Sequence, residues 1–156
     1  MSSKSGKIIA AVGVVVVLGV LFALPKMTDP TRATASLWQQ AGLDCLNNGH
    51  TGVGLHFHPN LRILVEGVEE GIPANVGVLK SCMGEVHTHD ASGKIHIESV
   101  NGSKEFYLKD FFVVFDKPLQ REGYNLVMKV DDKINFELGE LVLRDKQMIT
   151  IEYTKK

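Results

Sequence analysis

The sequence has few cysteines and no surplus of positive charge. It contains two cysteines, one tryptophan, and 17 Lys and Arg against 18 Asp and Glu, for a formal net charge of −1. It has no block of basic residues and no alternation of basic with aromatic residues, so nothing supports nucleic-acid binding and we expect no such partner. Internal repeats and low-complexity tracts are also missing. The 156 residues leave room for one ordinary domain and a short appendage.

The appendage is an uncharged run near the start, and no signal-peptidase site follows it. The run covers residues 8–24 and would form about 25 Å of helix, near the short end of what crosses a bilayer. Pro25 and Lys26 come next instead of a small-x-small pattern, and the Ala-Thr-Ala triplet at 33–35 lies too far downstream. This region also has no cysteine for lipidation. We expect an uncleaved signal-anchor, with a cleaved signal peptide as the alternative.

The charges around this run predict its orientation. Lys4 and Lys7 precede it, whereas Lys26 and Asp29 nearly cancel after it. The positive-inside rule therefore predicts a single-pass membrane protein with a cytoplasmic N-terminus and the remaining chain in the periplasm or extracellular space. The expected organisation is a cytoplasmic tip and transmembrane anchor (1–27), a stem with a short helix (28–48) and an extracytoplasmic β domain (49–156).

The two cysteines lie in the part of the chain that we expect outside the cytoplasm. Because that side of the membrane is oxidising and the count is even, Cys45 and Cys82 are predicted to form a disulfide. The alternative keeps Cys82 as a thiolate metal ligand, beside Met83.

One helix and then many strands are indicated after the anchor. "PTRATASLWQQAGL" has Thr31 or Thr34 as possible N-caps and Gly42 as a stop, which favours a short stem helix. The following segments alternate with a period of two, from "VGLHFHP" to "QMITIEY", while "LKDFFVVF" is ambiguous between helix and strand. Roughly seven to nine short strands predict a mainly β domain, built as an antiparallel sandwich or small barrel.

The segment "GEVHTHDASGKIHIES" reads as a β-hairpin with three histidines. His87 and His89 are two apart and should share a face. A two-residue turn at 92–93 would place His96 opposite His89, and a four-residue turn at 90–93 would place it opposite His87. Either even-numbered loop brings the three imidazoles to one face of the hairpin.

The same alternation separates the histidines from the core. His96 and Glu98 should point together, while Ile95 and Ile97 face the core. Upstream, "HFHPN" repeats the pattern, since its two histidines share a face and Phe57 takes the other.

Imidazoles spaced in this way on neighbouring strands can meet at one ion, and imidazole suits both zinc and copper. Crowded imidazoles also repel one another when protonated, unless something holds them neutral. The alternative is a solvated strand face on which histidine is merely tolerated. We therefore predict a copper or zinc site drawn from five residues. They are His56, His58, His87, His89 and His96.

These residues also carry a resemblance. "HFHPNLRILVEGVEEGIPANVGVLKSC", "VHTHDASGKIHIES" and "FYLKDFF" resemble a family of mostly uncharacterised, membrane-anchored extracytoplasmic proteins of bacteria and archaea. Its members share H-x-H-x-x-L, I-P-A-x-I-G, a Cys, H-T-H-D-x-S/T-G-x-I-H-I/V-E and a segment like F-T-L-G-x-F-F. Lys109 departs from this pattern, where Gly is usual, and the C-terminal strand pattern is less standard. The family has no established activity, so the resemblance implies a shared site without naming its chemistry.

Three classes of function follow. The favoured one is a membrane-anchored metal-binding module for copper or zinc, acting alone or as an accessory part of a membrane assembly. The second is a hydrolytic or hydrating enzyme with three His ligands and an activated water, for which Asp90 and Glu98 are the nearby candidates for a general base. The third is a structural or adhesion domain without metal. Nucleophilic catalysis by Ser92 has little support, because no strand-to-helix elbow surrounds it.

Overall fold

The computed structural model describes residues 30–46 and 49–156. The predicted anchor at 8–24 lies outside the described residues. Within the described ranges, no helix combines the length and the apolar character needed to cross a bilayer.

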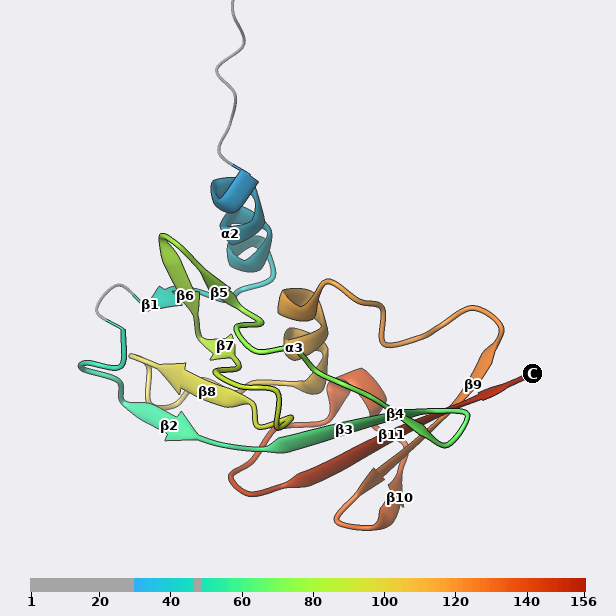
Figure 1. Cartoon of the computed structure of the whole chain (residues 1–156). Coiled ribbons are helices and arrows are strands. Elements are labelled where there is room, and N and C mark those ends of the chain that lie inside the picture. Colours follow the sequence, from blue (N-terminus) through green and yellow to red (C-terminus); the bar gives the residue numbers. More distant parts are fainter. Residues whose placement is uncertain (1–29, 47–48) are drawn as a thin grey trace, which may run out of the picture.

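The described chain is mainly β, as the sequence predicts, with one helix at the start and one in the middle (Figure 1). In chain order, the elements are α2 (Pro30–Gln40), β1 (Cys45–Leu46), β2 (Leu55–Phe57), β3 (Asn60–Val65), β4 (Val68–Glu70), β5 (Val78–Leu79), β6 (Cys82–Gly84), β7 (Val86–His87), β8 (His96–Ser99), α3 (Leu108–Phe115), β9 (Tyr124–Val130), β10 (Lys133–Asn135), the 3₁₀ turn η1 (Leu138–Glu140) and β11 (Met148–Lys155).

The largest sheet has five strands in the order β10-β9-β11-β3-β4. Its core face carries Ile63 of β3 and Ile149, Ile151 and Tyr153 of β11, all at most 1% exposed. The sequence predicts only antiparallel pairing, and this is wrong for one pair, because β3 and β11 run parallel. β11 lies between β9 and β3 and is antiparallel to β9, so the last strand is inserted into the middle of the sheet.

Two smaller sheets complete the fold, in the orders β1-β6-β5 and β2-β8-β7. Within the described ranges none of the three sheets closes on itself, so the small barrel considered from the sequence is not formed. The predicted disulfide is confirmed: Cys45 of β1 is bonded to Cys82 of β6. This bond removes Cys82 as a thiolate ligand for a metal.

The ambiguous segment "LKDFFVVF" forms the helix α3. Its apolar residues recur at helical spacing, with Leu108, Phe111, Phe112 and Phe115 all buried. At its start, the backbone N–H of Tyr107 donates a 2.8 Å hydrogen bond to the Asp110 carboxylate, which stabilises the first turn. The helix contacts β7 and η1, so it packs behind the strand that carries His87.

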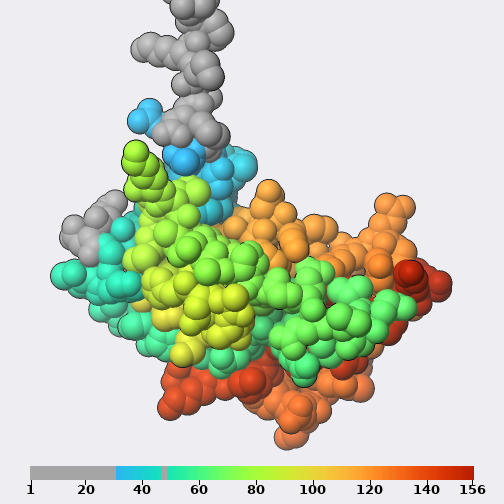
Figure 2. All heavy atoms as spheres, in the orientation of Figure 1, coloured from blue at the N-terminus to red at the C-terminus, as the bar shows by residue number. Residues whose placement is uncertain are grey.

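The predicted stem helix is present as α2, and it packs on the β domain. The candidate N-caps Thr31 and Thr34 lie inside this helix, which begins at Pro30. Trp38 and Leu43 are almost completely buried in the same core as the strands. In the space-filling view, α2 lies beside the light green segment that carries β5 and β6 (Figure 2), and it contacts β6.

Candidate metal centre

The sheet β2-β8-β7 fixes the positions of the candidate ligands. In the register of this sheet, His56 lies opposite Glu98, and His87 lies opposite His96. The second pair corresponds to the four-residue-turn alternative considered from the sequence. Ile95 and Ile97 are completely buried in the core, as predicted.

The hairpin differs from the prediction in that its strands part after His87. The backbone N–H of Thr88 donates to the carbonyl oxygen of Val76 at 2.9 Å, and that of Ile95 donates to Pro59 at 2.9 Å. Each arm of the predicted hairpin therefore pairs with a different neighbouring segment. The opening lets His89 turn toward His96, with their ring centroids 4.4 Å apart.

All five predicted histidines lie in one cluster, and a sixth joins them. The rings of His56 and His58 lie 4.6 Å apart, and His58 lies 4.5 Å from His96. His50, which the sequence reasoning did not select, has its ring centroid 5.2 Å from His89 and 5.9 Å from that of His87. The chain has six histidines, so every imidazole it carries is in this cluster.

The nitrogen atoms within the cluster are spaced as ligands of one ion would be. His56 Nε2 and His58 Nε2 are 2.9 Å apart, and His87 Nε2 and His89 Nε2 are 3.2 Å apart. Zinc binds imidazole nitrogen at about 2.0 to 2.1 Å, so two such nitrogens lie about 2.9 Å apart at a right angle and about 3.4 Å apart at a tetrahedral angle. Both observed distances fall in this range.

Glu98 reaches into the cluster from β8. Its side chain is completely buried, and both carboxylate oxygens lie 2.8 Å from Nδ1 of His50. Oε1 also lies 3.1 Å from Nε2 of His56 and 4.0 Å from Nδ1 of His96. The sequence predicts that Glu98 points with His96, but it gives no sign that this carboxylate would contact three histidines.

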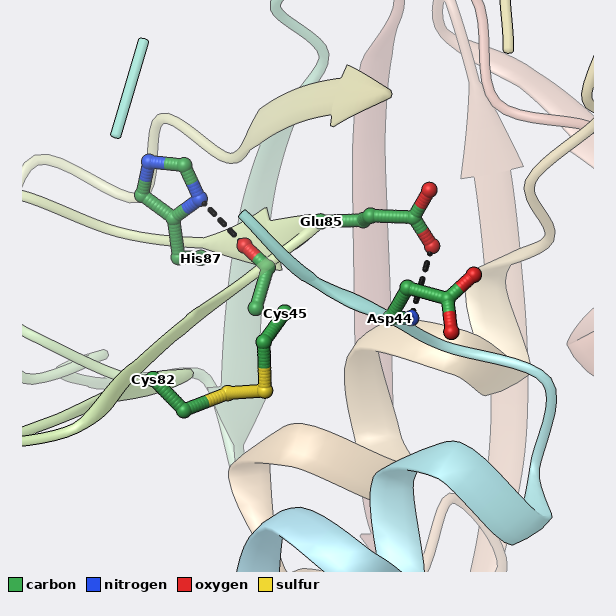
Figure 3. The surroundings of a disulfide bond; sticks show 6 residues. Asp44, Cys45, Cys82, Glu85 and His87 are labelled. Atoms are coloured by element: carbon green, nitrogen blue, oxygen red, sulfur yellow. Dashed lines mark hydrogen bonds between the residues drawn. A yellow bond between two sulfur atoms is a disulfide. The ribbon is translucent and has the colours of Figure 1, made fainter. Parts of the chain in front are cut away.

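His87 is held in one tautomer by the strand that precedes it. Its Nδ1 is 2.9 Å from the carbonyl oxygen of Gly84 (Figure 3). Since a carbonyl only accepts, Nδ1 carries the proton, and Nε2 keeps its lone pair facing the other imidazoles. Gly84 ends β6, two residues after the disulfide-bonded Cys82. A backbone carbonyl that orients a histidine in this way is a common partner of metal ligands.

A second buried carboxylate supports this corner of the fold without joining the cluster. Glu85 accepts a hydrogen bond from the backbone N–H of Asp44 at 2.9 Å (Figure 3). It accepts a second one from the Ser99 hydroxyl at 2.6 Å. It also pairs with Lys104, whose ammonium donates to the carbonyl oxygen of Gly42. These bonds tie the end of the stem to both strands next to the histidines.

Burial keeps part of the cluster neutral. Burial lowers the pKa of His87 to about 4, against the opposing effect of its bond to Gly84. Burial followed by the neighbouring imidazoles, His89 first, lowers the pKa of His96 to about 4. The pKa of His58 is also lowered, by burial and then by His56. His87 and His96 are therefore unprotonated at neutral pH, which is the form that binds metals.

The cluster is buried on one side and open on the other. His87 is 0% exposed and Nδ1 of His96 is buried with no hydrogen-bond partner, whereas the side chains of His50 and His56 are 52% and 43% exposed. A merely solvated strand face does not account for buried imidazoles with an unpartnered nitrogen. The open side gives an ion a route to the buried nitrogens.

Asp90 and Ser92, which lie near the histidines in the sequence, form hydrogen bonds with each other in the turn. The Asp90 carboxylate accepts the backbone N–H of Ser92 at 2.9 Å and also its hydroxyl. These two bonds lower the pKa of Asp90. The arrangement is a local Asx turn, and the Ser92 hydroxyl takes part in it by donating to Asp90 and accepting from the backbone N–H of Lys94.

The donor atoms fall into groups of three within which all ligand atoms lie within 4.8 Å of one another. Among the described residues these groups are His50 with His87 and His89, His56 with His58 and His96, and His87 with His96 and Glu98. Comparisons with protein-family models, curated proteins and solved structures find no match to this chain. The resemblance noted from the sequence therefore stays a prediction.

Proposed function

We propose that this chain is a membrane-anchored, extracytoplasmic metal-binding module that holds copper or zinc in its histidine cluster. The observation that carries the proposal is the convergence of all six imidazoles in one cluster, with the buried carboxylate of Glu98 against three of them, His50, His56 and His96. Folding gives no reason for this convergence, because buried imidazoles and carboxylates cost free energy unless something satisfies them.

The donor set supports copper or zinc over other ions. Calcium and magnesium prefer a cage of oxygen ligands. Among the described residues, the groups of possible ligands consist of histidines and one carboxylate, that of Glu98. Imidazole is a good ligand for zinc and for copper. Cys82 adds no thiolate, since it is held in the disulfide.

The proposed location rests on two features. The disulfide between Cys45 and Cys82 fits an oxidising compartment. The uncharged run at 8–24, with lysines before it, fits an anchor that leaves the domain outside the cytoplasm. A module fixed to the membrane in this way could deliver its ion to a neighbouring membrane protein, and we propose that kind of partner.

Binding is favoured over catalysis because neither candidate base is free. Both oxygens of Glu98 contact His50, and Asp90 is engaged by Ser92. A zinc hydrolase needs an open coordination position and a base beside it. Neither Glu98 nor Asp90 is free to act as that base.

Elemental analysis tests the proposal. The full-length chain, purified in detergent and incubated with Zn²⁺ or Cu²⁺, should retain metal after desalting. Replacing four of the exposed or half-exposed ligands together should abolish this; they are His50, His56, His58 and His89. Glu152→Gln is a suitable control, because it removes a carboxylate that pairs with Lys129 far from the cluster. Wild-type protein that retains neither metal would overturn the proposal.

A further inference from the structure

The six histidines form two groups of three that share no residue. His50, His87 and His89 make one group, which we name triplet A. The other, triplet B, contains His56, His58 and His96. Triplet A comes from the loop before β2 and from β7 with the residues after it, whereas triplet B comes from β2 with its following loop and from β8.

One ion cannot use all six imidazoles. An ion with bonds of about 2.1 Å reaches only donor atoms that lie within about 4.2 Å of one another. Zinc and copper sites in proteins also take about four ligands, not six imidazoles. The close nitrogen pairs, at 2.9 and 3.2 Å, each lie inside one triplet. The cluster thus has more donors than one ion needs, arranged as two sets.

Glu98 lies between the two sets. Its carboxylate contacts His50 of triplet A at 2.8 Å through both oxygens, and Oε1 contacts His56 of triplet B at 3.1 Å. The third group of donor atoms also connects the two triplets. It contains His87 of triplet A, His96 of triplet B and Glu98. A carboxylate with ligand atoms of two sets on its two oxygens has the placement of a bridge.

We infer that the cluster is a dinuclear centre, with one copper or zinc ion in each triplet and the Glu98 carboxylate bridging them. This inference rests on the proposed function. Each triplet then supplies three imidazole nitrogens to its ion. The groups among the described residues hold three ligands each, so the Glu98 carboxylate completes both four-coordinate sites by moving toward the two ions. The buried negative charge of Glu98 also offsets the repulsion between two divalent ions.

The inference has a consequence for function. Four protein ligands per ion leave no position for an activated water, and closed sites of this kind hold metal instead of catalysing hydrolysis. The proposed centre therefore carries two ions for storage or delivery, and the exposed side chains of His50 and His56 lie where ions would enter or leave.

Stoichiometry measures this directly. The full-length chain in detergent is loaded with Zn²⁺ alone, and separately with Cu²⁺ alone, then desalted and analysed for metal per protein. We expect two equivalents in the wild type and in Glu152→Gln. The double variant His50→Ala/His89→Ala, which leaves triplet A with one histidine, should retain one equivalent. His56→Ala/His58→Ala should do the same for triplet B.

The outcomes separate the two proposals. One equivalent in the wild type, lost in both double variants, would mean a single shared ion and would overturn the dinuclear inference while sparing metal binding. No metal in the wild type would overturn both. A circular dichroism spectrum checks that each variant is folded, and the wild-type stoichiometry decides the question even if a variant is not. Glu98→Gln gives a second readout, since loss of the bridge should weaken the retention of both ions.

Discussion

The five-stranded sheet and the sheet β2-β8-β7 differ in the side chains that they bury: the first buries apolar residues on one face, and the second also buries polar residues on the other face. In β11, buried Ile149, Ile151 and Tyr153 alternate with the half-exposed residues between them, the ordinary pattern of a strand with one face on the core. In β8, Ile97 is buried in the core, yet Glu98 on the opposite face is also 0% exposed. One face of β8 therefore serves the core and the other serves the histidine cluster.

This difference separates stability from function. Burial of isoleucine and tyrosine stabilises the fold at about 25 cal/mol per Å² of apolar surface removed from water. Burial of His87 and Glu98 costs free energy unless they are satisfied. The large sheet thus provides the rigid support, and the small sheet holds polar groups that folding alone does not favour. Variants in the core of the large sheet should therefore lower stability and leave metal retention unchanged. Variants in the exposed part of the histidine cluster should lower metal retention with little loss of stability.

The largest effect on stability is expected from the disulfide, which links neighbouring strands β1 and β6 of one small sheet. Cys45 and Cys82 are 37 positions apart, and closing a loop of that size contributes about 4 kcal/mol in the chain-entropy account. The double variant Cys45→Ser/Cys82→Ser should lower the free energy of unfolding by about that amount in urea titrations. An unchanged midpoint would show that the bond does not constrain the unfolded chain.

A cavity in the large sheet should come next and should spare the site. Ile151 is completely buried, so Ile151→Ala should cost about 3 kcal/mol through lost transfer free energy and the cavity left behind. The metal retained per folded protein should not change, because the residue lies outside the histidine cluster. Altered stoichiometry in the folded variant would contradict the separation of the two regions.

Acid should destabilise the metal-free protein through the small sheet. The pKa of His87 is lowered to about 4 in the fold by burial, while in the unfolded chain it is about 6.5. The unfolded state therefore takes up the proton first as pH falls, so stability is full above pH 6.5 and declines toward pH 4. Between pH 7 and pH 5 the loss from this residue is about 2 kcal/mol.

Urea titrations of metal-free protein at several pH values measure this loss. His87→Gln is the matched control, since it removes the titrating group, and its stability should depend less on pH over the same interval. A wild-type profile that is flat from pH 7 to pH 5 would mean that His87 is not held neutral by burial.

The smallest effect on stability is expected at the exposed part of the cluster. His56 is exposed and His58 half-buried, so His56→Ala/His58→Ala should change the stability of the metal-free protein by about 0.5 kcal/mol or less. The same variant should lose much of its stabilisation by added Zn²⁺, because a ligand that binds only the folded state raises its stability. Equal stabilisation of variant and wild type by Zn²⁺, seen as a thermal shift, would place the ion elsewhere.

The sequence predicts much of the site because local alternation is a strong signal. The period of two placed Ile95 and Ile97 in the core and His96 opposite either His87 or His89, and an even number of cysteines in a segment expected to be exported predicted the disulfide. The prediction failed where the signal is not local. His50 follows the sequence Asn-Asn-Gly, without the alternation of apolar and polar residues that predicts a strand, so nothing in its own segment marks it as a member of the cluster.

The fold shows the same limit. The parallel pairing of β3 with β11 joins segments far apart in the chain, and no local pattern reports it. "LKDFFVVF" was ambiguous because its residues favour strands while their spacing is helical. The spacing prevailed since it lets Leu108, Phe111 and Phe115 face the core together. The burial of Glu98 also depends on which strand lies opposite, which the sequence does not state.

X-ray absorption spectroscopy of the metal-loaded, full-length protein tests the central claim most directly. The account predicts zinc or copper bound by nitrogen and oxygen, with zinc at about 2.0 to 2.1 Å from imidazole and with the multiple scattering of several histidine rings. Sulfur at about 2.3 Å, or a spectrum without imidazole scattering, would contradict it, because the ion would then lie outside the histidine cluster.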